Sequence, residues 1–317
     1  MEKGAYFANR DYAAVPFSDK NFRKVKEKES AVVFVDGGNA EIIETATFAL
    51  QFIRAAAVKF SGKKREWARR KDFYVKTKAV VEGGISYQAK VEALNGELVM
   101  ELGLNAYDKS ILSGGRRAAP SKIGMLARRV MELSLAKEIA EEEKKVVIAL
   151  DGTLEAGFNG EEKHLQELYD AAEKNGNLVV ALAKTNSVLN TEGGLFAELL
   201  DEKAPEGAWV YAPVVEISSE KHKAEMGFVK MHASSKHIFR FEIYKKKSKD
   251  LEKAANALTF TANDLTFPGY PYGFIIADRF ARVSNQELEY LKAKNMAGKE
   301  MKTAINAKNA HEILDSM

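Results

Sequence analysis

Cysteine is absent from this sequence of 317 residues. Its absence excludes disulfide bonds and thiolate metal sites, and it leads us to expect a cytoplasmic protein. The sequence also lacks any run of about 18 apolar residues, the length that a membrane-spanning helix needs. Its first residues lack the apolar core of a signal peptide. Neither sign of charge is in large excess, because 48 Lys and Arg residues are balanced by 45 Asp and Glu residues. Any surface for nucleic acid must therefore be a local patch.

The composition is that of an ordinary globular protein, with 46% hydrophobic and 29% charged residues. The length favours a single core with insertions. Residues 1–30 are mixed and charged, and they predict a poorly packed N-terminal arm or a short helix. We expect one domain to occupy residues 31–317.

Two apolar segments that each end in Asp-Gly organise the chain. The first ends at Asp36 and is followed by Gly37 and Gly38, which permit a sharp turn and a close approach to the backbone. The second covers residues 145–151 and ends at Asp151. Each segment has the β-forming residues of a buried strand. If the two strands are neighbours, their carboxylates lie side by side, and such a pair suits Mg²⁺ or Mn²⁺.

The spacing of apolar and turn residues predicts an antiparallel meander followed by a strand–helix–strand unit. The predicted strands cover residues 31–36, 73–82, 85–94, 97–102, 145–151, 177–183, 208–217, 226–232 and 237–244. The predicted helices cover residues 121–143, 161–175, 249–259 and a late segment around 275–280. Residues 42–60 fit either a long strand or a helix, because periodicity does not separate the two there.

Two basic segments are candidate nucleic-acid contacts. Residues 61–71 combine six cations with Trp67, and we expect them to form a loop. Such a loop either holds phosphates and stacks a base, or it is a solvated hairpin tip with its indole anchored inward. Residues 245–249 form the second basic segment.

Three more charged residues are notable for their positions. Glu132 lies mid-helix among apolar residues, where a carboxylate is expected to be paired or to bind a metal. The alternative is that Glu132 lies on the polar edge of the helix and pairs with Arg128 or Arg129. Lys184 follows the strand at 177–183, where it either neutralises a phosphate or is a surface lysine. Asp278 lies on the late helix, behind a rigid aromatic turn.

This order of elements matches a ribonuclease-H-like (PIWI-like) fold, an α/β architecture with a mixed sheet flanked by helices. In that fold, acids on the first and fourth strands and on flanking helices converge on two metal ions. Asp36, Glu132, Asp151 and Asp278 are the candidates here. Two such ions activate a water molecule and stabilise the leaving oxygen of a phosphodiester.

The motifs resemble those of the NurA nucleases, and the resemblance runs from about residue 30 to the C-terminus. In chain order, the matching segments are Val35-Asp36-Gly37-Gly38, Arg128-Arg129-Val130-Met131-Glu132, Leu150-Asp151-Gly152-Thr153-Leu154, Lys184-Thr185-Asn186 and Gly269-Tyr270-Pro271-Tyr272-Gly273-Phe274-Ile275-Ile276-Ala277-Asp278. The first motif is Asp-Gly-Gly where Asp-Gly-Ser is usual in that family. This departure removes a hydroxyl but keeps the carboxylate.

The resemblance implies a DNA nuclease that depends on Mn²⁺ or Mg²⁺, with 5′–3′ exonuclease and single-strand endonuclease activity. Such proteins are homodimers that act in DNA end resection with a HerA-type hexameric helicase. By position, the resemblance makes Asp36, Glu132 and Asp151 metal ligands and Asp278 the fourth acid. It also places Tyr270 near the scissile phosphate.

Two other functions remain open from the sequence. A phosphotransferase of the actin and sugar-kinase type also begins with a strand ending in Asp-Gly, although its duplicated half and glycine-rich phosphate loop are not evident. A non-catalytic DNA-binding adaptor needs only the basic segments at 61–71 and 245–249, with the acids acting as structural pairs.

Overall fold

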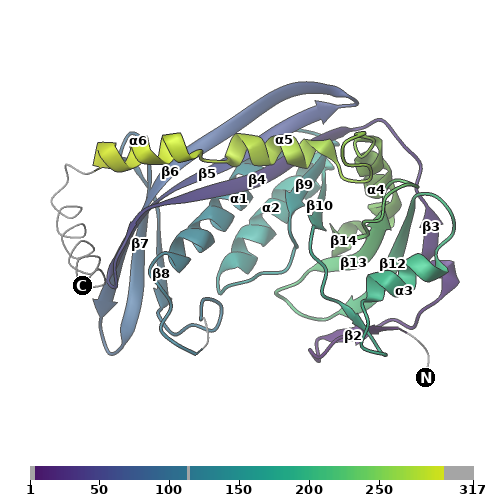
Figure 1. Ribbon diagram of the computed structural model, residues 1–317, viewed down its shortest axis with the longest axis horizontal. Helices are drawn as coiled ribbons and strands as arrows, with labels where there is room; N and C mark the ends of the chain where they lie inside the picture. The colour runs from purple at the N-terminus through teal and green to yellow at the C-terminus, as the bar shows by residue number, and fades with distance from the viewer. Residues whose placement is uncertain (1–3, 113–114, 296–317) are drawn as a thin grey trace, which may run out of the picture. The chain divides into compact units, whose positions relative to one another are not determined.

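The computed structural model describes residues 4–112 and 115–295 (Figure 1). The chain divides into two compact units. Unit 1 comprises Met1–Asp36, Ala57–Arg69 and Leu133–Ala277, and unit 2 comprises Gly37–Ala56, Arg70–Glu132 and Asp278–Met317. Strands β4, β5 and β6 and helices α1 and α5 contribute residues to both units. Among the described helices, none combines the length and the apolar composition needed to cross a membrane.

The strands are β1 (Ala5–Tyr6), β2 (Tyr12–Ala14), β3 (Phe22–Lys24), β4 (Ala31–Glu44), β5 (Phe48–Ser61), β6 (Lys64–Val81), β7 (Ile85–Ala93), β8 (Leu98–Asn105), β9 (Val147–Asp151), β10 (Leu178–Ala183), β11 (Leu189–Asn190), β12 (Trp209–Ile217), β13 (Ala224–Lys230) and β14 (Phe239–Tyr244). The α-helices are α1 (Lys122–Glu142), α2 (Glu161–Asn175), α3 (Phe196–Lys203), α4 (Leu251–Phe260), α5 (Tyr272–Ala281) and α6 (Asn285–Asn295). Two short 3₁₀ helices are η1 (Asp19–Asn21) and η2 (Lys245–Asp250).

Unit 1 contains a mixed sheet in the strand order β2-β12-β13-β14-β10-β9-β4, and β3 also pairs with β12. Strands β4, β9 and β10 run parallel, whereas β10, β14, β13 and β12 pair antiparallel. Helix α2 connects β9 to β10, so the strand–helix–strand unit predicted from the sequence is confirmed. A crossover of this kind is what brings two parallel strands together at one sheet edge.

Helix α2 packs its apolar side on the sheet of unit 1. Its buried residues include Leu165, Leu168 and Tyr169, and the Tyr169 ring stacks on Tyr244 of β14 at 3.9 Å between centroids. All six residues of β10 are buried, as expected for a parallel strand with both faces covered. These contacts fix the part of the sheet that carries Asp151.

The N-terminal segment differs from the expected loose arm or helix. Strands β2 and β3 both pair with β12, and β1 pairs with β11. Phe22 of β3 packs edge-on against Trp209 at 5.1 Å between ring centroids, and its ring also contacts Tyr211. These aromatic contacts explain why so charged a segment is ordered. The domain boundary at residue 30 stays a prediction.

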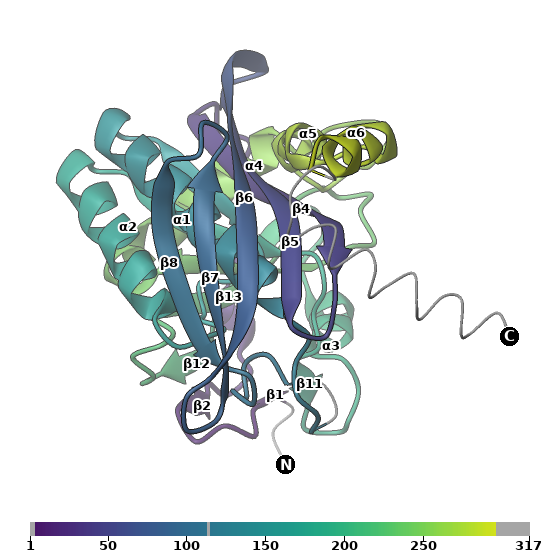
Figure 2. The same ribbon diagram turned by 90° about the vertical axis from the view of Figure 1, so that its left-hand side faces the viewer.

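Unit 2 contains the antiparallel meander β6-β7-β8 (Figure 2), which confirms the hairpins predicted from the sequence. Gly83 and Gly96 adopt the positive φ that these tight turns require. The open alternative at residues 42–60 is also decided, because β4 ends at Glu44 and β5 is a strand. Every residue from Ala49 to Val58 on β5 is buried, so packing overrides the helix propensity of its alanines.

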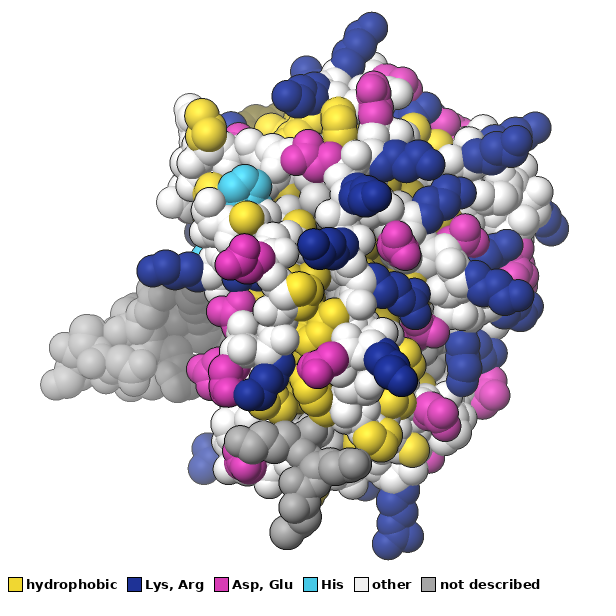
Figure 3. Space-filling model, turned by 90° about the vertical axis from the view of Figure 1, so that its right-hand side faces the viewer, with side chains coloured by type: hydrophobic (Ala, Val, Ile, Leu, Met, Phe, Trp, Pro, Cys, Tyr) yellow, Lys and Arg dark blue, Asp and Glu magenta, His cyan; other side chains and the backbone are white. Residues whose placement is uncertain are grey.

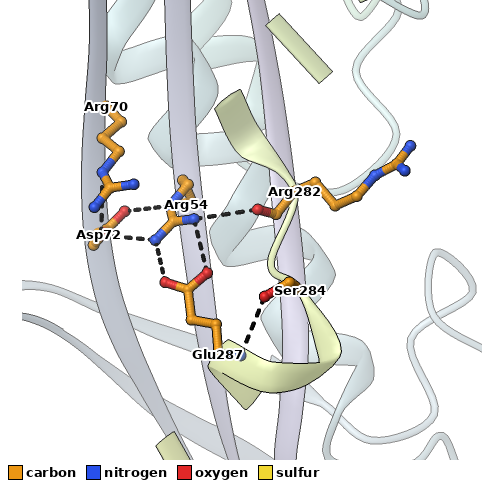
Figure 4. A network of polar contacts seen from close by, with 6 residues as sticks. All are labelled: Arg54, Arg70, Asp72, Arg282, Ser284 and Glu287. Carbon is orange, nitrogen blue, oxygen red and sulfur yellow. Dashed lines mark hydrogen bonds and ion pairs between the residues drawn. The ribbon is translucent and has the colours of Figure 1, made fainter. Parts of the chain in front are cut away.

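Within unit 2, Arg54 on β5 links helix α6 to strands β5 and β6 (Figure 4). Arg54 Nε lies 2.7 Å from Asp72 Oδ1, and Arg54 Nη2 lies 2.7 Å from Glu287 Oε1. Arg54 Nη1 also donates to the Arg282 carbonyl at 3.2 Å. Leu291 of the same helix packs in an apolar cluster with Ile42, Ile43, Leu50 and Phe52.

Two interpretations made from the sequence assign the wrong secondary structure. Strand β4 does not turn at Gly37 and Gly38 but continues to Glu44. The basic segment at 61–71 is not a loop, because β6 begins at Lys64 after the hairpin turn. Trp67 is half-buried and its Nε1 donates to Glu143 Oε1 at 3.2 Å, so the inward-anchored interpretation of the indole holds.

Candidate metal and phosphate site

Asp36 and Asp151 occupy matching positions on neighbouring parallel strands of unit 1. Val35 of β4 pairs with Leu150 of β9, so the next residues along the two strands are the two aspartates. Neighbouring strands lie about 4.8 Å apart, and paired residues present their side chains on the same side of the sheet. Both aspartates are half-buried at the carboxyl end of the pairing. The two strands are therefore neighbours, which is the condition for their carboxylates to share a cation.

Lys184 lies just past β10, the next strand along. Its Nζ is 2.6 Å from Asp151 Oδ2 and forms an ion pair with it. The Lys184 side chain is 46% exposed, whereas that of Asp151 is 22% exposed, so the ammonium reaches the carboxylate from the solvent side. The same Nζ lies 5.8 Å from the centre of the Tyr270 ring. Unit 1 therefore brings together four of the six residues singled out in the sequence.

Tyr270 belongs to an aromatic cluster and is only 6% exposed. Its ring packs near those of Phe239, Phe267 and Phe274, at 5.5 to 5.9 Å between centroids. The aromatic turn thus anchors the start of α5. Gly273 lets that helix approach β4, since a Cβ there would lie 2.1 Å from the Phe34 ring.

Glu132 lies in unit 2, near the middle of α1, and is 7% exposed. Its carboxylate is 3.4 Å from Arg128 Nε and 3.6 Å from an Arg129 guanidinium nitrogen, so the predicted partners are confirmed, whereas the predicted place on the polar edge is wrong because the residue is buried. A Cβ on Gly37 would lie 2.1 Å from Glu132 Oε1. The first glycine is therefore needed because the Glu132 carboxylate lies against the backbone directly after Asp36.

Asp278 also lies in unit 2, on the last turns of α5. It forms an i,i+4 ion pair with Arg282 at 2.8 Å, and its side chain is 43% exposed. A Cβ on Gly38 would lie 2.1 Å from the carbonyl oxygen of Ala281. The second glycine thus permits the close packing of this helix end on β4.

A buried polar cluster beside the Asp151 segment was missed from the sequence. Glu242 of β14 is fully buried, and it contacts Arg240, His222 and the backbone N–H of Leu154. Burial disfavours its charged form, but the His222 hydrogen bond and the Arg240 charge outweigh burial and hold the pKa of Glu242 below its ordinary value. A glutamate inside the apolar run Phe239–Tyr244 was the available signal.

The donor chemistry of the β4–β9 edge suits a hard divalent cation. Carboxylate oxygens are the ligands that Mg²⁺ and Mn²⁺ prefer, and the Lys184 ammonium shows that this edge attracts a positive charge. Within residues 4–112 and 115–295, however, no group of three or more His, Asp or Glu side chains is arranged to hold a metal ion. The two aspartates therefore offer a partial ligand set.

Several cations of the two basic segments form ion pairs or hydrogen bonds within the protein. Arg69 pairs with Glu142, and Lys246 pairs with Glu173. Lys245 Nζ donates to the Ile217 carbonyl at 2.7 Å. On the face drawn in Figure 3, Lys and Arg side chains are interspersed with Asp and Glu rather than gathered in one block. This distribution agrees with the near-neutral net charge.

Comparison with known proteins decides the family. The family model described as the NurA domain matches residues 30–283. The chain belongs to the NurA family. Among curated proteins, none matches this NurA-family chain in sequence. The sequence resemblance is thereby confirmed.

Solved structures give the fold context of this NurA-family chain. The NurA nuclease from Sulfolobus solfataricus is similar to it with a TM-score of 0.50 and 14% identity over 87% of each chain. The catalytic domain of human Endonuclease V has a TM-score of 0.39 and 16% identity over 87% of this chain and 92% of that chain. An Argonaute from A. aeolicus has a TM-score of 0.36 and 12% identity over 81% of this chain and 29% of that chain. This NurA-family chain therefore has the predicted fold, a ribonuclease-H-like mixed sheet flanked by helices.

Proposed function

We propose that this protein is a metal-dependent DNA nuclease whose cation is held by Asp36 and Asp151. The observation that carries the proposal is the pairing of Val35 with Leu150, which sets the two aspartates side by side on parallel strands. A hydrolase of phosphodiesters needs cations near its substrate, because they stabilise charge that develops on phosphate oxygens.

Mn²⁺ or Mg²⁺, as two ions, would supply that charge and would activate water when bound. Glu132 and Asp278 are proposed as further ligands on the strength of the family resemblance. Within unit 2, both residues belong to segments that pack on the glycines that follow Asp36 in the chain. Lys184 is proposed to neutralise a substrate phosphate. To do so, its ammonium group must leave the Asp151 carboxylate and contact the phosphate instead. Tyr270 would hold the Lys184 side chain over its ring.

The finer activity is proposed from the family. We expect 5′–3′ exonuclease and single-strand endonuclease activity in DNA end resection, in the cytoplasm, with the protein acting as a homodimer. A HerA-type hexameric helicase is the expected partner. The family match favours this function over the phosphotransferase considered from the sequence.

A non-catalytic DNA-binding adaptor is the second candidate, because a specific observation favours it. Several of these acids are paired with cations: Asp151 with Lys184, Glu132 with Arg128 and Arg129, and Asp278 with Arg282. Such pairs are what structural acids would form. They are also what metal ligands would form before a cation competes for them, so an activity assay must decide.

The test is degradation of 5′-labelled single-stranded and duplex DNA by purified protein across Mn²⁺, Mg²⁺ and Ca²⁺. We expect Asp36→Ala and Asp151→Asn to abolish cleavage while the far-UV circular dichroism stays unchanged. Asp170→Asn is the matched control, since Asp170 is an exposed carboxylate on α2. Undiminished cleavage by either aspartate variant would refute the metal assignment. DNA binding without cleavage at any metal would select the adaptor.

A further inference from the structure

One carboxylate in the sheet of unit 1 is fully buried. Glu242 lies between Phe241 and Ile243 on β14, and all three residues are fully buried. Burying a charge is costly unless it is paired and hydrogen-bonded. Glu242 Oε1 accepts from Arg240 Nε at 2.6 Å, and Glu242 Oε2 lies 3.1 Å from His222 Nε2. Both oxygens are thus used within the protein.

The third contact of Glu242 reaches the segment that follows Asp151. Glu242 Oε2 accepts from the backbone N–H of Leu154 at 2.7 Å. Two residues earlier, the N–H of Gly152 donates to the Leu182 carbonyl at 3.1 Å. Leu154 is itself fully buried. The backbone leaving the proposed metal ligand is therefore held at two points within three residues.

Glu155 extends the same hydrogen-bonded cluster to strand β2. The Tyr12 hydroxyl donates to Glu155 Oε1 at 3.0 Å and lies 2.8 Å from His222 Nδ1. His222 is fully buried, and its Nε2 must donate because it faces a carboxylate. Through His222, which lies between β12 and β13, the cluster joins β2, β14 and the residues that follow Asp151.

We propose that Glu242, supported by His222 and Arg240, is a positioning residue that fixes residues 152–155 and thereby the Asp151 carboxylate for cation binding. The proposal rests on the proposed function. Residues behind metal ligands typically change metal affinity or activity by 10–100-fold when they are altered. Because Glu242 acts through the backbone rather than by touching the cation, its loss should weaken metal use more than it weakens the metal-saturated rate.

The test uses full-length Glu242→Gln, which keeps the shape of the side chain and loses its charge. We expect the Mn²⁺ concentration for half-maximal DNA cleavage to rise at least about tenfold, with the rate at saturating Mn²⁺ recovering to within about threefold. Hydrogen exchange of the peptide that contains Leu154, measured by mass spectrometry, should accelerate about tenfold. Glu225→Gln on the neighbouring strand β13 is the matched control, because Glu225 is half-buried and lies outside the cluster.

Tyr12→Phe provides a milder variant if Glu242→Gln fails to fold. It removes only the hydroxyl that links His222 to Glu155, so both readouts should move in the same direction by a smaller factor. Wild-type Mn²⁺ dependence together with wild-type exchange at Leu154 in the folded variants would overturn the proposal. Wild-type protein without nuclease activity would instead overturn the proposed function, and the exchange measurement would still decide whether Glu242 holds this segment.

Discussion

Replacing Arg54 with Met should destabilise unit 2 strongly. All five N–H donors of this guanidinium are used: two toward Asp72, two toward Glu287 and one toward the Arg282 carbonyl (Figure 4). The Arg54 side chain is 3% exposed, and that of Asp72 is 11% exposed. Met fills a similar volume but leaves the Asp72 carboxylate buried without its main partner.

The expected cost is about 3–5 kcal/mol, because removing one partner of a buried pair leaves the other charge uncompensated. Arg70→Met is the matched control. Arg70 also approaches Asp72, but at 3.8 Å and with a side chain that is 57% exposed. Because Arg70 is exposed and its contact with Asp72 is long, this pair contributes at most about 1 kcal/mol. Arg54→Lys should lie between the two, since an ammonium cannot reproduce the planar fork of donors.

Urea unfolding followed by far-UV circular dichroism measures these differences. A free energy of unfolding for Arg54→Met within about 1 kcal/mol of wild type would refute the reasoning, as would an equal loss in Arg70→Met. The difference in free energy of unfolding between wild type and Arg54→Met should also depend on pH. The hydrogen bond and charge of Arg54 hold the pKa of Glu287 below its ordinary value. The stabilisation from Glu287 is therefore present above about pH 4.3, the unfolded value, and is lost as the pH falls through the lower folded value.

Two further substitutions test the glycine that follows Asp36 and the start of β9. Gly37→Ala should displace the Glu132 carboxylate, because the new Cβ would lie 2.1 Å from Glu132 Oε1. We expect this variant to lose Mn²⁺-dependent DNA cleavage at least tenfold. Gly84→Ala is the control and should cleave DNA like wild type, because no atom lies within 4 Å of a Cβ at Gly84. Asn177→Ala should lower the free energy of unfolding by about 1–3 kcal/mol, measured by urea unfolding followed by tryptophan fluorescence. Asn177 is 1% exposed, and its side chain accepts from the Val146 N–H and donates to two backbone carbonyls. An unchanged urea midpoint would contradict its role in ordering the start of β9.

Much of the fold was predictable because its signals are local. The apolar run that ends at Asp151 and the helix at 161–175 are specified within a few residues, and the apolar run at 31–36 gives the start of β4 but not its end. Residues 61–71 were misread because their charges resemble a solvated loop, whereas the strand form depends on distant acids such as Glu142 and Glu143. The alanines of β5 likewise form a strand because both of its faces are buried.

The site was predictable only in part for the same reason. Asp36, Asp151 and Lys184 each lie at the end of an apolar run, and the ends of such runs can be located from the sequence. Gly37 and Gly38 were taken for a turn, because nothing in the sequence shows that Glu132 and Ala281 lie against them. The Glu242 cluster was missed because its partners come from four separate segments.

Mn²⁺ binding in the absence of DNA tests the central assignment most directly. Electron paramagnetic resonance measures the loss of the free aquo-ion signal as purified protein is titrated with Mn²⁺. We predict binding by wild type and by the exposed control Asp170→Asn, and affinity at least about tenfold weaker in both Asp36→Asn and Asp151→Asn. Wild-type affinity in these two variants would contradict the assignment of the paired aspartates as the cation site.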